Sequence, residues 1–213
     1  MPHNKPKVIH KRKLEDYSEV MKHEHSSSNY FGAFITKPKN IHVDIQDKDE
    51  KIVLVLRQHL ITQVKPTVVL TAAIFLIPGL LEFSGFFAAL PNQFLTAFYI
   101  FWVILAFGLV THAFLMWFFN VYIVTDERVI DVDFNSMIHR NISSAKIENI
   151  EDISSKSVGP LAAIFDYGTI NLQTAGASNE FEFEHVPQPG KVKKLLNELL
   201  LEEEREKLEG RVN

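Results

Sequence analysis

Cysteine is absent from this chain of 213 residues. Disulfides, thiolate metal sites and cysteine nucleophiles are therefore excluded. The sequence also lacks a glycine-rich phosphate loop, a nucleophile elbow and an HExxH motif. Its first residues are basic and lead into polar sequence rather than an apolar run, so we expect no cleavable signal peptide. These absences predict a protein that is not an enzyme and uses no cofactor.

Charge is almost missing from the middle of the chain. Between residues 67 and 119 Glu82 is the sole charged side chain, whereas all 22 bases lie outside that block. A bilayer requires such segregation, because an ordinary core would interleave charge at helical or strand period. The pattern predicts two membrane spans, at about 67–90 and 94–119, that form a transmembrane hairpin over 66–119.

The two predicted spans are unequal. The second has 26 residues without a formal charge, which is about 39 Å of helix and enough to cross a bilayer with tilt. The first carries Glu82 near its far end and contains Pro78-Gly79, which should kink the helix. Its far boundary stays open. Trp117, near the end of the second span, is placed for an interfacial belt.

Lysine and arginine are distributed unevenly around the predicted hairpin. The loop around Asn92 has none. The bases nearest the spans all lie on the other side: Lys51, Arg57, Lys65, Arg128 and Arg140. By the positive-inside rule, this predicts a multi-pass protein of the cell (inner) membrane with both termini in the cytoplasm.

The chain before the hairpin divides into two parts. Residues 1–38 are polar, carry histidine, lysine and arginine clusters, and predict a disordered basic cytoplasmic tail. Residues 39–65 form a pre-membrane segment, in which alternation at 41–45 and a β-rich run at 52–56 indicate a possible strand pair. A helix running from Glu50 into the membrane is the competing interpretation. Whether 41–57 pairs with the later β domain is left open.

Beyond residue 120 the pattern changes to short strands. The β-rich runs are 121–124, 128–134, 137–142, 145–153, 168–172 and 180–186. Residues 191–207 then read as an amphipathic helix. We therefore predict a cytoplasmic domain over 120–207, a small mainly-β barrel or sandwich capped by its C-terminal helix, followed by a tail at 208–213.

Several motifs in this order carry a family resemblance. They are VYIVTDERVI at 121–130, IENIEDI at 147–153, FDYGTI at 165–170, and Glu50 with LRQH at 56–59 before the first span. The set resembles the bacterial pleckstrin-homology-like (PH-like, YdbS-like) two-span membrane protein family, long classed as a domain of unknown function. The resemblance covers about residues 50–200. It implies a bent seven-strand PH-like barrel closed at one end by its helix, and it brings no catalytic residue or ligand.

Physical roles can be argued for some motif residues. Asp126-Glu127 should lie in the first hairpin turn. Gly168 is interpreted as a positive-φ or bulge position that lets the strand bend. Gly159-Pro160 breaks the chain before the apolar stretch 161–165, which either packs in the core or faces the membrane surface. The core is the favoured interpretation.

Polar residues in the spans are the candidates for an intramembrane function. His112 is a candidate because polar groups there are costly, with Glu82 as its sole ionisable partner. Alternatively, His112 stays neutral and hydrogen-bonds to Thr111 or a helix carbonyl. We expect no metal site, since histidines in a mobile tail offer weak coordination. Asp131 and Asp133 share a strand face, which we interpret as the wet face rather than a paired-carboxylate site.

Charge also limits the partners. Residues 120–190 contain four bases and eleven acids, a net charge of −7, so we expect no phosphoinositide binding. Residues 1–65 carry a net charge of +4 and would lie against the lipid bilayer. No nucleic-acid partner is needed to explain so mild a bias.

The sequence therefore favours a non-enzymatic integral membrane protein that presents its PH-like domain as an interaction or scaffold module. Its partner would be another protein or a second copy of itself. The alternative is a subunit of an oligomeric transporter or channel, based on Glu82, His112 and the Pro78-Gly79 kink.

Overall fold

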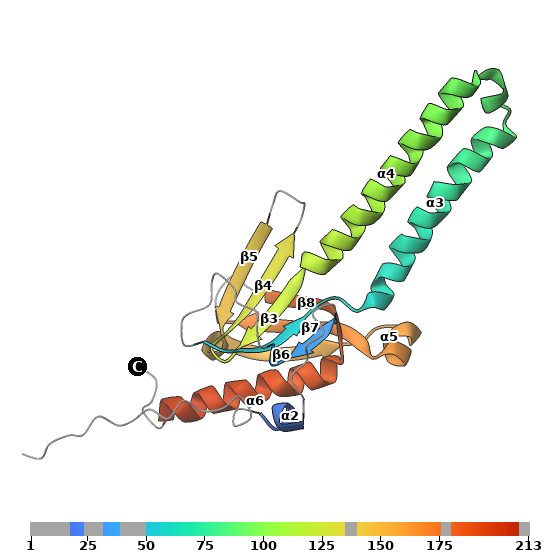
Figure 1. Ribbon diagram of the computed structural model, residues 1–213. Helices are drawn as coiled ribbons and strands as arrows, with labels where there is room; N and C mark the ends of the chain where they lie inside the picture. The colour runs from blue at the N-terminus through green and yellow to red at the C-terminus, as the bar shows by residue number, and fades with distance from the viewer. Residues whose placement is uncertain (1–17, 24–31, 39–49, 135–139, 176–179, 209–213) are drawn as a thin grey trace, which may run out of the picture.

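The computed structural model describes residues 18–23, 32–38, 50–134, 140–175 and 180–208. Figure 1 shows a β domain from which two long helices project together, side by side. All pairings between strands are antiparallel. The strands are rich in valine, isoleucine and phenylalanine, which suit a pleated, half-buried surface.

The first sheet contains five strands in sequence order, β1-β2-β3-β4-β5. Their bounds are β1 Phe34–Thr36, β2 Ile52–Leu56, β3 Val121–Thr125, β4 Arg128–Phe134 and β5 Arg140–Lys146. The two long helices lie between β2 and β3 in the sequence. Since β2 pairs with β3, the two ends of the helical hairpin are held next to each other by the sheet.

The second sheet contains three strands, in the order β6-β7-β8. Their bounds are β6 Ile150–Lys156, β7 Tyr167–Thr174 and β8 Glu180–Pro187. A 3-10 turn, η3 Ile147–Asn149, leads into β6, and a short helix, α5 Pro160–Phe165, separates β6 from β7. The long helix α6 Pro189–Leu208 follows β8 and runs beneath the strands (Figure 1).

The main core lies between both sheets and α6. The helix α6 contributes apolar side chains spaced three or four residues apart, so they lie on one face, as expected of an amphipathic helix. Its members include Val192, Leu195, Leu196 and Leu199 from α6, Val53, Leu54, Leu56, Val124 and Val129 from the first sheet, and Ile153, Ile170, Leu172, Phe181 and Phe183 from the second. Met21, from the short helix α2 Glu19–His23, is also fully buried in this core.

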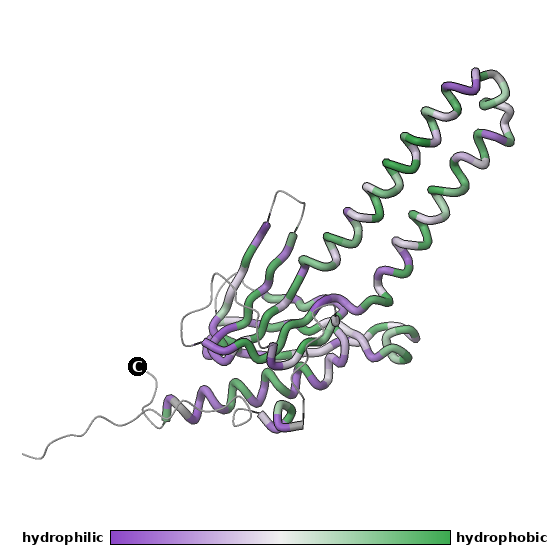
Figure 2. Tube along the Cα trace, viewed as in Figure 1, coloured by the Kyte–Doolittle hydropathy of each residue, from purple (hydrophilic) through white to green (hydrophobic). Residues whose placement is uncertain are grey.

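The two long helices are α3 Val64–Phe83 and α4 Asn92–Phe119. A 3-10 turn, η1 Leu60–Gln63, precedes α3, and η2 Phe87–Ala89 lies in the connection at the tip. Both helical segments are long and apolar enough to cross a membrane, and none of their most apolar stretch is buried within the protein. Figure 2 shows the green of hydrophobic residues along both helices.

The mainly-β domain, its C-terminal helix and the two long apolar helices are confirmed. The first helix ends at Phe83 rather than at residue 90, because the chain turns away at Ser84 and Gly85. Gly85 has a positive φ of 75°. The structure also forms a strand rather than a helix after Glu50.

Two further predictions were wrong, one about the number of strands and one about the N-terminal tail. The described part of the C-terminal domain contributes six strands, β3 to β8, rather than seven, and they lie in two sheets. The strands β1 and β2, which precede the two long helices in the sequence, complete the first sheet. The expected disordered tail, residues 1–38, contains α2 and β1. Its apolar Met21 and Ile35 gave no periodic signal, yet both are fully buried. The alternation predicted at 41–45 lies outside the described residues.

Candidate functional site

Three consecutive residues, Arg57, Gln58 and His59, connect β2 to the first long helix. Arg57 is buried, with 7% of its surface exposed. Its Nε donates to the carbonyl oxygen of Phe118 at 2.9 Å, and its guanidinium lies 4.6 Å from the centre of the Phe118 ring. The last carbonyls of a helix lack intrahelical donors and carry partial negative charge. Arg57 therefore caps the C-terminal end of α4.

Arg57 also holds the segment before β1. Its Nη1 donates to the carbonyl oxygen of Gly32 at 3.0 Å. Burial lowers the pKa of Arg57, but a guanidinium keeps its charge in proteins. A single cation thus joins the segment before β1 to the end of α4.

Gln58 connects α4 with the second sheet. Its carbonyl oxygen accepts a hydrogen bond from the indole Nε1 of Trp117 at 2.9 Å, and Trp117 is the buried residue of α4. Its amide Nε2 donates to Glu184 on β8 at 3.4 Å. The indole hydrogen bond fixes the base of α4 against the backbone that leads into α3.

His59 ties the start of the first long helix to the second sheet. Its backbone N–H donates to the carbonyl oxygen of His185 at 2.8 Å. Its Nδ1 accepts from the backbone N–H of Ile61 at 3.2 Å and so caps η1. The ring stacks on Tyr167, with 5.6 Å between centres. Burial lowers the pKa of His59, and the negative charge of Asp166 partly opposes this effect. The lowered pKa favours the neutral ring, which the cap requires because Nδ1 must accept a hydrogen bond.

We call Arg57, Gln58, His59, Trp117 and Phe118 the junction. It links the bases of both long helices to both sheets. A further contact lies beside it, because the side-chain oxygen of Asn120 accepts from the backbone N–H of Phe134 at 2.7 Å. With backbone, aromatic and charged contacts combined, the junction connects the domain to both long helices.

A second buried network joins the start of β2 to the β3–β4 turn. Glu50 is buried; it accepts from the Thr125 hydroxyl at 2.6 Å and pairs with Arg128 Nε at 3.0 Å. Asp126 accepts from the backbone N–H of Lys51 at 2.7 Å. Burial raises the pKa of Asp126, and the hydrogen bond from Lys51 opposes that rise. Residues of the motif VYIVTDERVI therefore hold the β3–β4 turn against the segment that leads into β2.

Carboxylates gather where β4 faces β8. Asp131 and Asp133 are both half-buried, so the expected wet face is only partly wet. Burial, then the charges of Asp133 and Glu184, raise the pKa of Asp131 to about 6. The Tyr122 hydroxyl beside them accepts from the backbone N–H of Glu184 at 3.1 Å. Among the described residues no group of three histidine, aspartate or glutamate side chains is placed to hold a metal ion.

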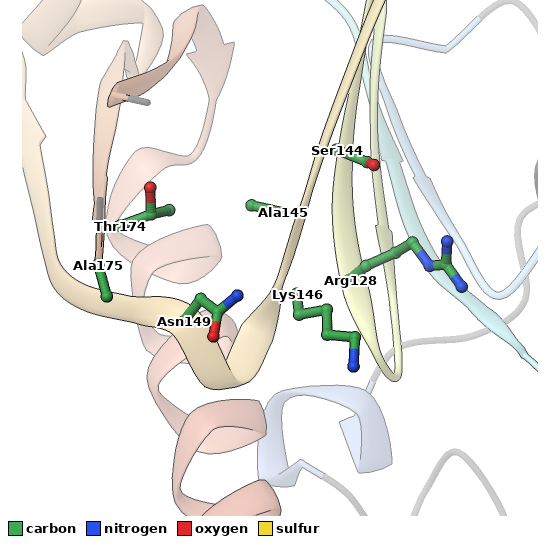
Figure 3. Close-up of a pocket in the computed structure, with 7 residues that line it drawn as sticks. All are labelled: Arg128, Ser144, Ala145, Lys146, Asn149, Thr174 and Ala175. Atoms are coloured by element: carbon green, nitrogen blue, oxygen red, sulfur yellow. The ribbon is translucent and has the colours of Figure 1, made fainter. Parts of the chain in front are cut away.

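A hollow of about 390 Å³ lies at the seam between the two sheets. It is lined by Arg128, Ser144, Ala145, Lys146, Asn149, Thr174 and Ala175. Figure 3 shows the Arg128 guanidinium turned away from Ala145 and Thr174. Arg128 pairs with Glu50, and Lys146 pairs with Glu148 at 3.2 Å. Both bases at the hollow are thus engaged with carboxylates, and the hollow shows no built anion site.

The order of helices and strands around the junction agrees with a known family. The bacterial PH domain family matches residues 67–200, which include all but the first turn of α3, the whole of α4, β3 to β8 and the first part of α6. The chain belongs to this family. The resemblance inferred from the motifs is thereby confirmed. Arg57, Gln58 and His59 precede the matched region.

One solved structure similar to this family member is a DUF1696 family protein with a pleckstrin-homology domain from Shewanella loihica PV-4. The two are 15% identical with a TM-score of 0.32, over 38% of this chain and 70% of that one. No curated protein matches the sequence.

The two residues predicted as candidates for an intramembrane function, Glu82 and His112, lie apart in this family member. Glu82 lies one residue before the end of α3, at the tip of the hairpin. His112 lies on α4, about 10 Å along the axis from its opposite end at Phe119. Both side chains are exposed on the helix surface. The structure therefore forms no proton-relay pair from them within one copy of the chain.

The predicted glycine and proline positions have different outcomes. The helix α3 continues through Pro78, and nothing lies within 4 Å of where a Cβ on Gly79 would be. Gly159 caps α5 with φ of 95°. Gly168 has no positive φ; a strand register shift adjoins it. A Cβ at Gly168 would come within 2.8 Å of the Lys156 carbonyl oxygen.

Sequence reasoning missed the role of the junction. It placed Trp117 in an interfacial belt, whereas the indole is buried against Gln58. Arg57 was counted as one of several flanking bases. A signal was present, because Arg57 directly follows five apolar strand residues, where a solvated base is unusual.

Proposed function

We propose that this family member is a non-enzymatic integral membrane protein whose hairpin crosses the cell membrane and holds the PH-like domain on the cytoplasmic side as an interaction module. One observation carries the membrane part: the two projecting helices expose large apolar side chains along their length. Phe75 on α3 and Phe107 on α4 are both 73% exposed. Such a surface is unfavourable in water, and helices satisfy their backbone groups in lipid.

The charge distribution supports the orientation. The tip between Ser84 and Pro91 has no base, whereas Arg57 and Lys65 lie at the base of the hairpin and Lys51 lies directly before β2 in the β domain. Lysine and arginine are enriched on cytoplasmic flanks. The β domain, which joins the hairpin at this base through the end of β2 and the start of β3, would therefore lie in the cytoplasm.

Exposed acidic residues on the second sheet support the proposed role of the domain as an interaction module. On its outer face Asp152, Glu180 and Glu182 are exposed, and the register places Asp152 opposite Gln173, which pairs with Glu180. We name Asp152, Glu180 and Glu182 the acidic face. An acidic face repels anionic headgroups and favours a protein partner with a basic surface.

Topology is tested with single cysteines, since the chain has none of its own. Asn92→Cys at the tip should react with a membrane-impermeant maleimide on intact cells, and Glu204→Cys on α6 should react only after lysis. Labelling of Glu204→Cys on intact cells, or protection of Asn92→Cys there, would contradict the proposed orientation.

The interaction is tested by affinity capture of the full chain from mild detergent. Charge reversal by Glu180→Lys with Glu182→Lys should remove the captured protein, and higher salt should weaken capture. Glu204→Lys on α6 is the matched control, because it reverses an exposed acid away from the acidic face. If both variants capture the same proteins as the unmodified chain, the acidic face is not the docking surface.

A further inference from the structure

The helix α5 exposes nearly all of its apolar side chains. Leu161 is 53% exposed, Ile164 73% and Phe165 43%, and Val158, just before the helix, is 69% exposed. Ala162 is the residue of α5 that is buried. The interpretation of 161–165 as core was therefore wrong. A contiguous run of apolar side chains on a surface marks a contact with lipid or protein.

The position of α5 points to lipid. Its Phe165 ring lies 6.4 Å from the ring of His59, which caps the turn leading into α3. Figure 1 shows α5 beside the start of α3, at the end of the β domain from which both long helices leave. Leu60 and Val64, which follow His59 at the start of the hairpin, are also exposed. The apolar surface of α5 thus adjoins that of the hairpin.

The ends of α5 are held in place. Gly159 begins the helix with φ of 95°, and Asp166 ends it in the left-handed region with φ of 48°. The Asp166 carbonyl oxygen accepts from the backbone N–H of Gln188 at 2.8 Å. The following Tyr167 stacks on His59. The same residue that anchors the hairpin therefore anchors the C-terminal end of α5.

We infer that α5 and Val158 insert into the interfacial region of the bilayer, as a third membrane contact beside the two spans. This inference rests on the proposed membrane hairpin. Apolar side chains that sit at headgroup depth add buried area to the attachment and resist tilting of the domain. Exposed Lys156 and Lys65 flank the site and suit an anionic leaflet, whereas exposed Asp166 opposes it. The apolar area, rather than charge, carries this contact.

Spin labels on single cysteines test the inference in lipid nanodiscs of the full chain. Labels at Ile164→Cys, Phe107→Cys and Glu204→Cys replace exposed side chains on α5, mid-α4 and distal α6. Collisions with O₂, which concentrates in lipid, are compared with collisions with a nickel chelate, which stays in water. We expect the ratio of O₂ to nickel accessibility to be high at 107, raised at 164 and low at 204.

The labels separate failure of this inference from failure of the proposed hairpin. A high ratio at 107 with the same low ratio at 164 as at 204 would overturn the α5 contact and leave the hairpin intact. Low accessibility of 164 to both reagents would mean that protein covers α5, which also overturns the lipid contact. A low ratio at 107 would overturn the membrane hairpin and the α5 contact together.

Discussion

At the residue scale, Arg57 concentrates several contacts in one buried side chain. It donates to Phe118 O and Gly32 O and stacks on the Phe118 ring. A substitution that removes these donors leaves the two buried carbonyl oxygens without a hydrogen-bond partner. The resulting loss of folding free energy exceeds the contribution of an ordinary hydrogen bond. The residue therefore sets how firmly the end of α4 is held.

The first prediction concerns this cap. Arg57→Ala should lower the free energy of unfolding by about 2 kcal/mol, measured by thermal unfolding of the full chain in detergent. Lys146→Ala is the control, because the Lys146 side chain is 69% exposed and pairs with the partly exposed Glu148, and this substitution should change stability by at most ~0.5 kcal/mol. Equal effects of the two substitutions would show that Arg57 does not act as a buried cap.

A second prediction follows from Asp131. Its pKa of about 6 lies above the ordinary 3.8, because burial and the charges of Asp133 and Glu184 disfavour the carboxylate. The folded state then holds this proton more tightly than the unfolded chain does. The resulting stability is present below pH 3.8 and is lost as the pH rises through 6.

Asp131→Asn removes this dependence. At pH 7 the variant should be more stable than the unmodified chain by about 1 kcal/mol, a value reduced for partial solvent screening. The advantage should shrink towards pH 4. Melting temperatures measured at several pH values test this, with the exposed Asp152→Asn as control. An advantage of Asp131→Asn that does not change with pH would contradict the linkage.

At the element scale, the β6–β7 pair depends on close backbone approach. A Cβ at Gly168 would lie 2.5 Å from Ser157 Oγ and 2.8 Å from the Lys156 carbonyl oxygen. Gly168→Ala should therefore force the strands apart and destabilise the protein by about 2 kcal/mol. Gly190→Ala, at a site with nothing within 4 Å, is the control. Both are measured by denaturant unfolding, and similar midpoints would refute the close approach.

The elements also show what the sequence could reveal. The length of α4 was readable because an uninterrupted apolar run specifies a helix long enough to cross a membrane, and β8 was readable because its period-two alternation reflects burial of one face. The pairing of β2 with β3 was not readable, since a hairpin of more than 60 residues separates them. Phe34–Thr36 is too short a strand to carry a period. The exposure of α5 depends on tertiary placement, so its composition suggested core.

At the scale of the whole molecule, the junction decides whether the domain moves with the hairpin or independently of it. Trp117 contributes a hydrogen bond to Gln58 O, and Arg57 contributes the cap on α4. Connected domains move relative to each other unless their interface is held by such contacts. A fixed domain would present its acidic face at one distance and angle from the hairpin.

The last prediction measures this rigidity. Spin labels at Phe107→Cys on α4 and Glu204→Cys on α6 report the distance between hairpin and domain, and in the unmodified junction the distance distribution should be narrow. Trp117→Phe removes the indole donor but keeps an aromatic ring, and together with Arg57→Ala it should broaden the distribution. Arg205→Ala, which removes an ion pair within α6, should leave the width unchanged. If the junction variants also keep a narrow distribution, then the pairing of β2 with β3 alone is sufficient to fix the domain on the hairpin, and the side chains of the junction serve stability rather than orientation.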